Sequence, residues 1–388
     1  MKKEKNTNNL QNSQSPVPNS KSNFLYPKSI LVTGGAGFIG SNFIHYLFEK
    51  TEFEGRIVNV DKLTYAGNLE NLREIENGWG KGKERYFFEK ADIGDFPQMR
   101  EIFQKYKVDT VVNFAAESHV DRSIFGPKDF MQTNIMGTFN LLEVARQYWQ
   151  DKDKDEDSKD EVLFHHISTD EVYGSAEEGE YFYENSPYQP NSPYSASKAS
   201  SDHLVRAYYQ TYGLPVTISN CSNNYGPYQF PEKLIPLMIL NILEEKTLPV
   251  YGDGKNVRDW LYVEDHCSAI WEILSKGRVG ETYNIGGENE WENIKLVNFL
   301  CEKVAKIKGK DKDYYKKLIT FVKDRPGHDR RYAINCDKIK KELGWRQKFN
   351  FEEGLDTTIK WYINHRGWID NVRSGEYRKW IKKNYGER

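Results

Sequence analysis

The chain has 388 residues, 38% of them hydrophobic and 14% aromatic, so it is long enough for one large or two compact globular units. Its 55 basic and 57 acidic residues leave a net charge of -2, so no global field favours nucleic acid or a membrane. Four widely spaced cysteines without a Cys-x-x-Cys pair disfavour a zinc site and a dense disulfide framework. We expect a cytoplasmic protein without a metal.

Two segments of the chain are too polar to contribute to a core. Residues 1–28 are rich in Asn, Ser, Lys and Gln and offer almost nothing to bury, which predicts a disordered tail. No apolar run approaches the ~18 residues of a membrane span, and the N-terminus lacks the apolar core of an export signal. Residues 151–161 mix both charges without an apolar residue, which predicts a solvated loop.

A glycine-rich turn follows the first predicted strand, at residues 29–33. Gly34, Gly37 and Gly40 precede an apolar-periodic helix that runs through Leu47. This spacing allows a tight turn, close approach of the backbone to a pyrophosphate and close helix packing, while the helix N-terminus attracts the anion. Such a loop alone is weak support, because it is also found as an ordinary turn.

An acidic residue strengthens the nucleotide-binding interpretation. A second predicted strand, residues 56–60, ends in Asp61, about 20 residues after the last glycine of the turn, where an acid holds the adenosine ribose hydroxyls. A carboxylate at this position would repel the 2′-phosphate of NADP. The sequence therefore predicts NAD as the cofactor.

Strands and helices continue to alternate along the chain. Further strands are predicted at residues 86–88, 110–114, 163–167 and 214–220, and helices at 96–106 and 127–149. This alternation predicts an α/β fold, a Rossmann-type doubly wound parallel sheet. From Phe230 onward the pattern loosens. We expect an NAD-binding domain at 29–228 and a smaller C-terminal α/β domain at 229–388, mainly substrate-binding, with some segments returning to the first.

The chemistry is predicted to centre on one short stretch. Thr169, Asp170 and Glu171 follow the strand at 163–167, at the carboxyl end where open α/β sheets bind ligands. Tyr194 and Lys198 are four residues apart, which places them on one face of a helix, where the lysine can lower the phenol pKa. Tyr-x-x-x-Lys also occurs elsewhere in the chain, so the preceding acid pair and the upstream turn decide the interpretation.

Two arginines stand out in the C-terminal part. Arg258 and Arg325 lie beside acids in turns rich in Pro, Gly or Trp, rather than on helices of alternating charge. The ordinary interpretation of such residues is surface charge. The alternative is a diphosphate site, because a guanidinium matches phosphate geometry.

Six runs together resemble one family: TGGAGFIG (33–40), STDEVYG (168–174), YSASK (194–198), NNYGP (223–227), RDWLYVEDH (258–266) and DRPGHD (324–329). The chain resembles the dTDP-glucose 4,6-dehydratases, which are extended short-chain dehydrogenases/reductases, from residue 30 to about 361. The Thr-Asp-Glu triplet is the most specific feature, since related sugar-nucleotide epimerases typically lack the acid pair. The resemblance implies a homodimer with tightly held NAD and a role in deoxysugar biosynthesis of the dTDP-rhamnose type.

The resemblance also implies residue roles. Tyr194, assisted by Lys198 and with Thr169 bonded to the same hydroxyl, would deprotonate the sugar 4-hydroxyl during C4 oxidation. Glu171 would then remove the C5 proton while Asp170 protonates the departing 6-hydroxyl. Hydride would return to C6 and yield the 4-keto-6-deoxy sugar.

Two sets of contacts follow from the same resemblance. The implied cofactor contacts are Gly34, Gly37, Phe38, Ile39, Gly40, Asp61, Lys62, Leu63, Thr64, Asp92, Ile93, Ala115, Ala116, Thr133, Tyr194, Lys198 and Asn224. The implied sugar-nucleotide contacts are Ser118, Thr169, Asn223, Lys233, Leu234, Pro249, Tyr251, Arg258, Asn293, Asp324, Arg325 and His328.

Three alternatives remain open from the sequence. The enzyme could be a 4,6-dehydratase acting on UDP-glucose or another nucleotide hexose, since the acid pair says nothing about the base. It could be a sugar-nucleotide epimerase, which the acid pair disfavours. It could also be a catalytically silent NAD-binding module, although Tyr194, Lys198 and Glu171 are all present.

Overall fold

The computed structural model describes residues 26–152 and 161–374. The predictions of a disordered tail and of a solvated loop therefore fall largely outside the described residues.

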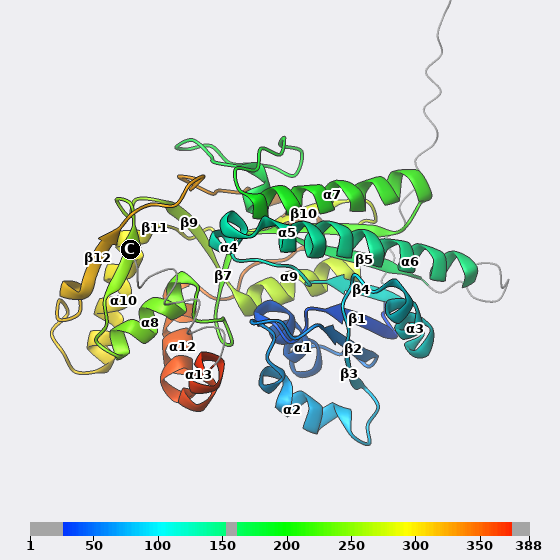
Figure 1. Cartoon of the computed structure of the whole chain (residues 1–388), viewed down its shortest axis with the longest axis horizontal. Coiled ribbons are helices and arrows are strands. Elements are labelled where there is room, and N and C mark those ends of the chain that lie inside the picture. The colour runs from blue at the N-terminus through cyan, green and yellow to red at the C-terminus, as the bar shows by residue number, and fades with distance from the viewer. Residues whose placement is uncertain (1–25, 153–160, 375–388) are drawn as a thin grey trace, which may run out of the picture.

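A seven-stranded, all-parallel sheet forms the centre of the larger unit (Figure 1). Its strand order is β10-β6-β5-β4-β1-β2-β3. The strands are β1 (Ser29–Thr33), β2 (Arg56–Asp61), β3 (Tyr86–Lys90), β4 (Thr110–Asn113), β5 (Leu163–Thr169), β6 (Val216–Cys221) and β10 (Thr282–Ile285). Every residue of β1 and β5 is buried, as expected for central strands covered on both faces. The predicted Rossmann-type fold is confirmed.

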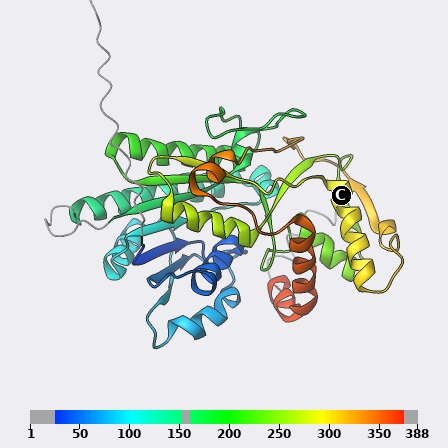
Figure 2. The same ribbon diagram turned by 180° about the vertical axis from the view of Figure 1, so that it is seen from behind.

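Helices cover both faces of this sheet (Figures 1 and 2). On one face lie α3 (Phe96–Tyr106), α6 (Thr138–Lys152) and α7 (Pro193–Tyr212), whose apolar residues share a core with the strands. On the other face lie α1 (Phe38–Lys50) and α9 (Val263–Lys276). Their apolar stripes cover the sheet on both faces. The carboxyl edge, where polar residues lie, is therefore the part of the sheet that is open to solvent.

The single helix predicted at 127–149 is wrong in detail. The structure has α5 (Pro127–Phe130), a π-helical segment η3 (Met131–Gly137) and then α6. In η3 the Asn134 amide nitrogen donates to Ser197 Oγ at 2.8 Å and to the Glu117 carbonyl at 3.0 Å. An apolar period of about 3.6 residues does not reveal one wider turn, and π segments are frequent at functional sites.

A second unit packs around its own core, to the left in Figure 1. It contains α8 (Leu234–Leu243), β8 (Leu248–Tyr251), α10 (Asn293–Ile307), β12 (Ile319–Val322), α12 (Phe351–Asn364) and α13 (Arg366–Arg373). Strand β8 pairs with β12 in parallel.

The shorter elements of the whole molecule are η1 (Leu69–Leu72), α2 (Arg73–Ile75), η2 (Glu76–Gly80), α4 (Val120–Phe125), η4 (Asp170–Tyr173), η5 (Lys316–Leu318) and α11 (Asp337–Leu343).

The two units are joined by a small mixed sheet. Strand β7 (Asn223–Tyr225) pairs in parallel with β9 (Val257–Tyr262), which pairs antiparallel with β11 (Glu290–Glu292). The motif at 223–227 therefore begins in a strand. Helix α9 and strand β10 return to the large sheet from beyond residue 228, while the boundary itself stays a prediction.

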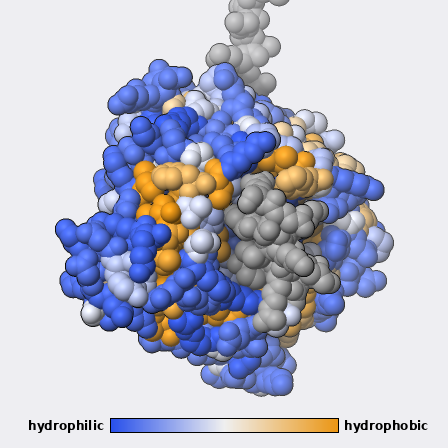
Figure 3. All heavy atoms as spheres, turned by 60° about the vertical axis from the view of Figure 1, so that its left-hand side comes forward, coloured by the Kyte–Doolittle hydropathy of each residue, from blue (hydrophilic) through white to orange (hydrophobic). Residues whose placement is uncertain are grey.

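The face of the molecule shown in Figure 3 is largely hydrophilic, with hydrophobic residues gathered in patches. Among the described residues, every helix is too short or too polar to cross a lipid bilayer.

The start of α7 generates a stability prediction. The Ser192 hydroxyl accepts from the Ser195 N–H at 3.1 Å, and the Ser195 hydroxyl accepts from the Ser192 N–H at 3.1 Å. Replacing Ser192 by Ala removes this capping box and should lower the free energy of unfolding by about 1 kcal/mol. Urea unfolding measures the change. Ser192→Asp keeps a cap and should lose far less; equal losses in both variants would contradict the capping role.

Candidate active site

The backbone at the glycine turn after β1 packs too closely against its neighbours for side chains. Gly34 has φ +66°, and a Cβ there would lie 2.9 Å from Ala115 Cα. Helix α1 begins at Phe38 after Gly37, which has no side chain to cap it, so the first N–H groups of the helix point outward. An uncapped helix N-terminus at a glycine turn fits a pyrophosphate.

Asp61 closes the same loop at the end of β2. Its carboxylate accepts the Ala36 N–H at 3.0 Å and the Leu63 N–H at 2.7 Å. Burial raises the pKa of Asp61, and these two hydrogen bonds oppose the rise. Nearby, Lys62 Nζ lies 2.6 Å from Asp92 Oδ2 at the rim. The glycine turn and the buried acid fit the dinucleotide that the sequence predicts.

One cavity runs from this loop along the carboxyl edge of the sheet. The predicted residues that line it are Gly34, Gly37, Phe38, Ile39, Gly40, Asp61, Lys62, Thr64, Asp92, Ile93, Ala115, Ala116, Ser118, Thr133, Thr169, Asp170, Glu171, Tyr194, Lys198, Asn223, Asn224 and Lys233. They come from stretches that lie far apart in the sequence and that the sheet brings together.

The acid pair lies at the end of β5, in the first turn of η4. Asp170 is 2% exposed and Glu171 9% exposed. Burial raises the pKa of Asp170 well above its ordinary value, and the neighbouring Glu171 carboxylate raises it further. Burial also raises the pKa of Glu171, but Arg325, Arg258 and Lys233 oppose the rise. The structure thus favours a protonated Asp170 beside a more acidic Glu171.

Tyr194 and Lys198 face the same cavity from α7. Burial raises the pKa of Tyr194 well above its ordinary value, with Glu171 adding to the rise and a hydrogen bond from Thr169 opposing it. Burial lowers the pKa of Lys198 to about 8. In this structure burial outweighs the predicted lowering of the phenol pKa by the lysine. The positive charge of a nicotinamide ring would add to the stabilisation of a phenolate.

Two arginines from beyond residue 228 provide positive charge near Glu171. The Arg258 guanidinium is buried, donates to the Asp329 carbonyl at 2.9 Å and stacks 4.1 Å from the centre of the Tyr332 ring. Surface charge, the alternative left open by the sequence, is therefore wrong for Arg258. Arg325 pairs with Asp121 at 3.1 Å.

The remaining predicted contacts do not line this cavity. Several lie around Asp121: the Tyr251 hydroxyl donates to its carboxylate at 2.7 Å, and the His328 ring packs edge-on against Tyr251 at 6.1 Å. The predicted residues outside the cavity are Leu63, Leu234, Pro249, Tyr251, Arg258, Asn293, Asp324, Arg325 and His328. All except Leu63 come from beyond residue 228, and three of them, Tyr251, Asp324 and Arg325, contact Asp121 or His328.

The sequence did not single out several residues at the site. Glu232 lines the cavity, is 4% exposed, and accepts from the Tyr65 hydroxyl at 2.9 Å; burial raises its pKa to about 7. The Tyr332 hydroxyl lies 3.4 Å from Glu171 Oε2. Glu232 could have been detected in the sequence as the acid beside Lys233. Tyr332 is far from Glu171 in the sequence and comes close to it only in the folded chain.

No cluster of three or more metal-ligating side chains occurs in residues 26–152 and 161–374. The four cysteines are buried and free. Metal-free chemistry stays a prediction.

Known proteins resemble the chain over nearly its whole length. Residues 31–358 match the family model for GDP-mannose 4,6 dehydratase. The chain is 55% identical to dTDP-glucose 4,6-dehydratase 1 of Escherichia coli K12 over 365 residues, 92% of this chain and 98% of the relative. It is 55% identical to dTDP-glucose 4,6-dehydratase of Neisseria meningitidis serogroup B over 355 residues, 90% of this chain and 98% of that protein.

Solved structures agree with this relationship. The dTDP-glucose 4,6-dehydratase of Bacillus anthracis, in complex with NAD, is 48% identical with a TM-score of 0.76, covering 89% of this chain and 99% of that one. The Streptomyces venezuelae enzyme, with NAD and a dTDP ligand bound, is 44% identical with a TM-score of 0.80, covering 89% and 99%. The chain therefore belongs to the NAD-dependent sugar-nucleotide 4,6-dehydratases and, among them, to the dTDP-glucose 4,6-dehydratase family.

Proposed function

We propose that the chain converts dTDP-glucose to dTDP-4-keto-6-deoxyglucose and water, with NAD retained through the cycle, as a step of deoxysugar biosynthesis. The observation that carries the proposal is the pair of buried carboxyl groups in unlike surroundings, Asp170 and Glu171, in one cavity with Tyr194 and Lys198. A dehydration needs an acid and a base side by side, and an oxidation needs a base at the hydroxyl.

The first stage is oxidation at C4. Tyr194, as phenolate, takes the proton of the 4-hydroxyl, Lys198 stabilises the phenolate charge, and Thr169 hydrogen-bonds the reacting oxygen. Bound NAD would supply the hydride acceptor and, later, the hydride donor. The resulting 4-ketone makes the C5 proton acidic.

The second stage is elimination of water across C5 and C6. Glu171 takes the C5 proton, because three neighbouring cations favour its carboxylate form. Asp170 gives its proton to the departing 6-hydroxyl, because burial and the adjacent acid favour its protonated form. Reduction at C6 and protonation at C5 complete a redox-neutral reaction.

The nucleotide diphosphate is assigned to the second unit. Arg258 and Arg325 place two guanidinium groups near Glu171, and Lys233 Nζ donates to the Ser118 carbonyl at 2.9 Å at the cavity edge. Positively charged side chains between the acid pair and the second unit would bind the diphosphate that is attached to the sugar.

A homodimer in the cytoplasm, without nucleic-acid or membrane partners, remains part of the proposal. Helices α6 and α7 lie side by side on one face of the sheet (Figure 1). Apolar side chains are exposed on this face: Met136 is 49%, Phe139 39% and Tyr212 49% exposed. Contact with a second copy would cover them.

A label-transfer experiment tests the proposed function. Deuterium placed on C4 of dTDP-glucose should appear on C6 of the product within the same molecule, because oxidation and reduction share one retained cofactor. Mass spectrometry of a mixture with carbon-13-labelled, undeuterated substrate detects crossover. UDP-glucose is the parallel substrate and should react more slowly. Release of one NADH per sugar, or deuterium on the carbon-13 product, contradicts a dehydratase.

The acid and base roles give a second prediction. Glu171→Gln should block exchange of the C5 proton, since the amide is no base, yet still allow oxidation at C4. Asp170→Asn, its matched variant, should keep C5 exchange and lose expulsion of the 6-hydroxyl. Nuclear magnetic resonance in D2O follows C5, and absorbance at 340 nm follows C4 oxidation. Reversed outcomes for the two variants would exchange their roles.

The cations around Glu171 give a prediction on pH dependence. Arg325 holds down a pKa that burial raises, so Arg325→Gln should raise it further. Because the base works above its pKa, the acid limb of C5 exchange should move to higher pH by about one unit, a tenfold loss at low pH.

Arg330→Gln is the control for this experiment, because Arg330 is 54% exposed and pairs with Asp253 instead. Its acid limb should match the wild type. An unmoved limb in Arg325→Gln would remove Arg325 from the surroundings that set the base.

A further inference from the structure

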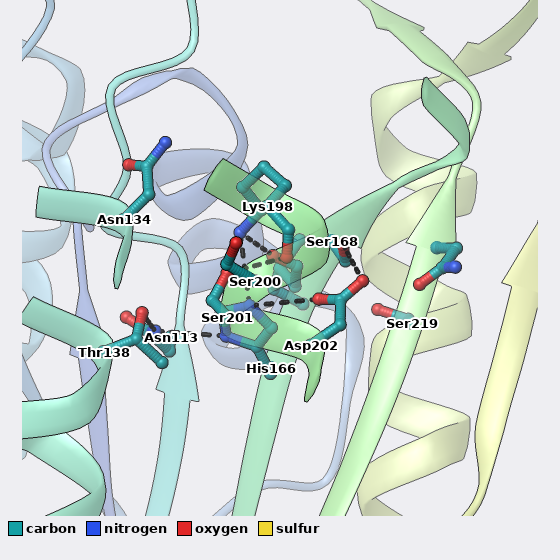
Figure 4. Close-up of polar contacts among 12 residues, drawn as sticks. Asn113, Asn134, Thr138, His166, Ser168, Lys198, Ser200, Ser201, Asp202 and Ser219 are labelled. Atoms are coloured by element: carbon teal, nitrogen blue, oxygen red, sulfur yellow. Dashed lines mark hydrogen bonds and ion pairs between the residues drawn. The ribbon is translucent and has the colours of Figure 1, made fainter. Parts of the chain in front are cut away.

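Behind Lys198 lies a connected group of buried polar side chains that the reaction described above does not use (Figure 4). Lys198 Nζ is 3.3 Å from His166 Nε2, and the same ring nitrogen is 3.4 Å from Asp202 Oδ1. His166 is 0% exposed and Asp202 2% exposed. Neither lines the cavity, so neither touches a substrate or cofactor there.

Helix and strand periodicity explain the arrangement. Lys198 and Asp202 are four residues apart on α7, so both face β5. On β5, His166 and Ser168 point to α7, and the Ser168 hydroxyl donates to Asp202 Oδ2 at 2.7 Å. His165 points to the opposite side of the strand, where its ring nitrogens contact Thr217 and Ser219. The two adjacent histidines are thus equally buried but only one adjoins Lys198.

The hydrogen bonds around His166 orient its ring. The Thr33 hydroxyl donates to Asn113 Oδ1 at 2.7 Å, which leaves the Asn113 amide nitrogen as the donor to His166 Nδ1 at 3.2 Å. Burial and Lys198 lower the pKa of His166 well below its ordinary value, so the ring is neutral. A neutral ring that accepts at Nδ1 has its hydrogen on Nε2, the nitrogen that lies between Asp202 Oδ1 and Lys198 Nζ.

Lys198 itself needs a counter-charge. It is 4% exposed, and the Ile167 carbonyl accepts from its Nζ at 2.7 Å, but a carbonyl has no net charge. Besides His166 on β5, the titratable neighbours are Cys221 on β6 and, on its own helix, Asp202 and Tyr194. Asp202 is the strongest of the groups that oppose the fall of the Lys198 pKa. A buried ammonium without such a partner is costly.

We infer that Asp202 and His166 are positioning residues: Asp202 keeps Lys198 in its ammonium form, and the His166 ring fixes the distance between the two charges. The inference rests on the proposed function, in which the Lys198 ammonium stabilises the Tyr194 phenolate. Neither residue forms or breaks a bond with the substrate. Their effect is to hold Lys198 charged over the pH range in which the oxidation proceeds.

Asp202→Asn tests the counter-charge. The amide keeps the size of the side chain and a hydrogen bond to Ser168 but removes the charge. Since Asp202 opposes the fall of the Lys198 pKa, its loss should move the alkaline limb of kcat to lower pH by about one unit, or tenfold in rate on that limb. KM for dTDP-glucose should change by less than about twofold, because Asp202 lies outside the cavity.

A second readout does not depend on turnover. NADH affinity can be followed by fluorescence from pH 6 to pH 10. In Asp202→Asn it should begin to weaken at a lower pH than in the wild type, since Lys198 is a proposed cofactor contact. If the wild type makes no 4-keto product, the proposed function fails, while this titration still tests the link between Asp202 and Lys198.

The adjacent histidines supply the matched pair of variants. His166→Gln should move both alkaline limbs in the same direction as Asp202→Asn, and it replaces that variant as the test should Asp202→Asn not fold. His165→Gln, equally buried on the other face, should leave both limbs in place even where it lowers the melting temperature. The inference is overturned if the Asp202 and His166 variants lose activity equally at every pH, or if His165→Gln moves the limbs as much.

Discussion

Desolvation of ionisable groups is the constraint on which the site depends. Asp170, Glu171 and Lys198 are each at most 9% exposed, and burial favours the neutral form of all three. What differs is the neighbour that restores charge. Glu171 has cations near it, Lys198 has the buried carboxyl of Asp202 on the other side of the His166 ring, and Asp170 has another acid beside it. The same physical cost therefore yields a base, an ammonium and an acid within one cavity.

The charges that distinguish these groups come from different parts of the fold. The large sheet and α7 supply the carboxyl groups, the phenol and Lys198, while Arg258 comes from β9 of the small mixed sheet and Arg325 from the segment after β12. A Rossmann-type sheet alone would bury the acid pair without the guanidinium groups that make its two members unlike. The cavity thus lies mainly along the large sheet, whereas the charges around Glu171 come from both parts of the fold.

The sequence predicted most of the fold and most of the residues that line the cavity, for reasons visible in particular segments. The strand at 163–167 is an unbroken buried run, and the acid pair and the Tyr/Lys pair are contiguous motifs. The π turn within 127–149 has no signature in an apolar period. The partnership of His166 with Asp202 depends on which face of a fully buried strand meets a helix, and a strand buried on both sides has no polar face to indicate it. Burial of Arg258 depends on residues some 70 positions away.

The small mixed sheet between the units has a mechanical consequence. Strands β7, β9 and β11 lie where the chain passes between the units at residues 221–223, 262–263 and 285–290, and they are bonded to one another. The chain crosses again on either side of α11, which packs against β10 and α9. A hinge acts through a few residues that absorb large backbone changes, whereas several crossings, three of them tied by backbone hydrogen bonds, oppose bending between the units. We therefore expect the relative orientation of Glu171 and its arginines to be preserved from one turnover to the next.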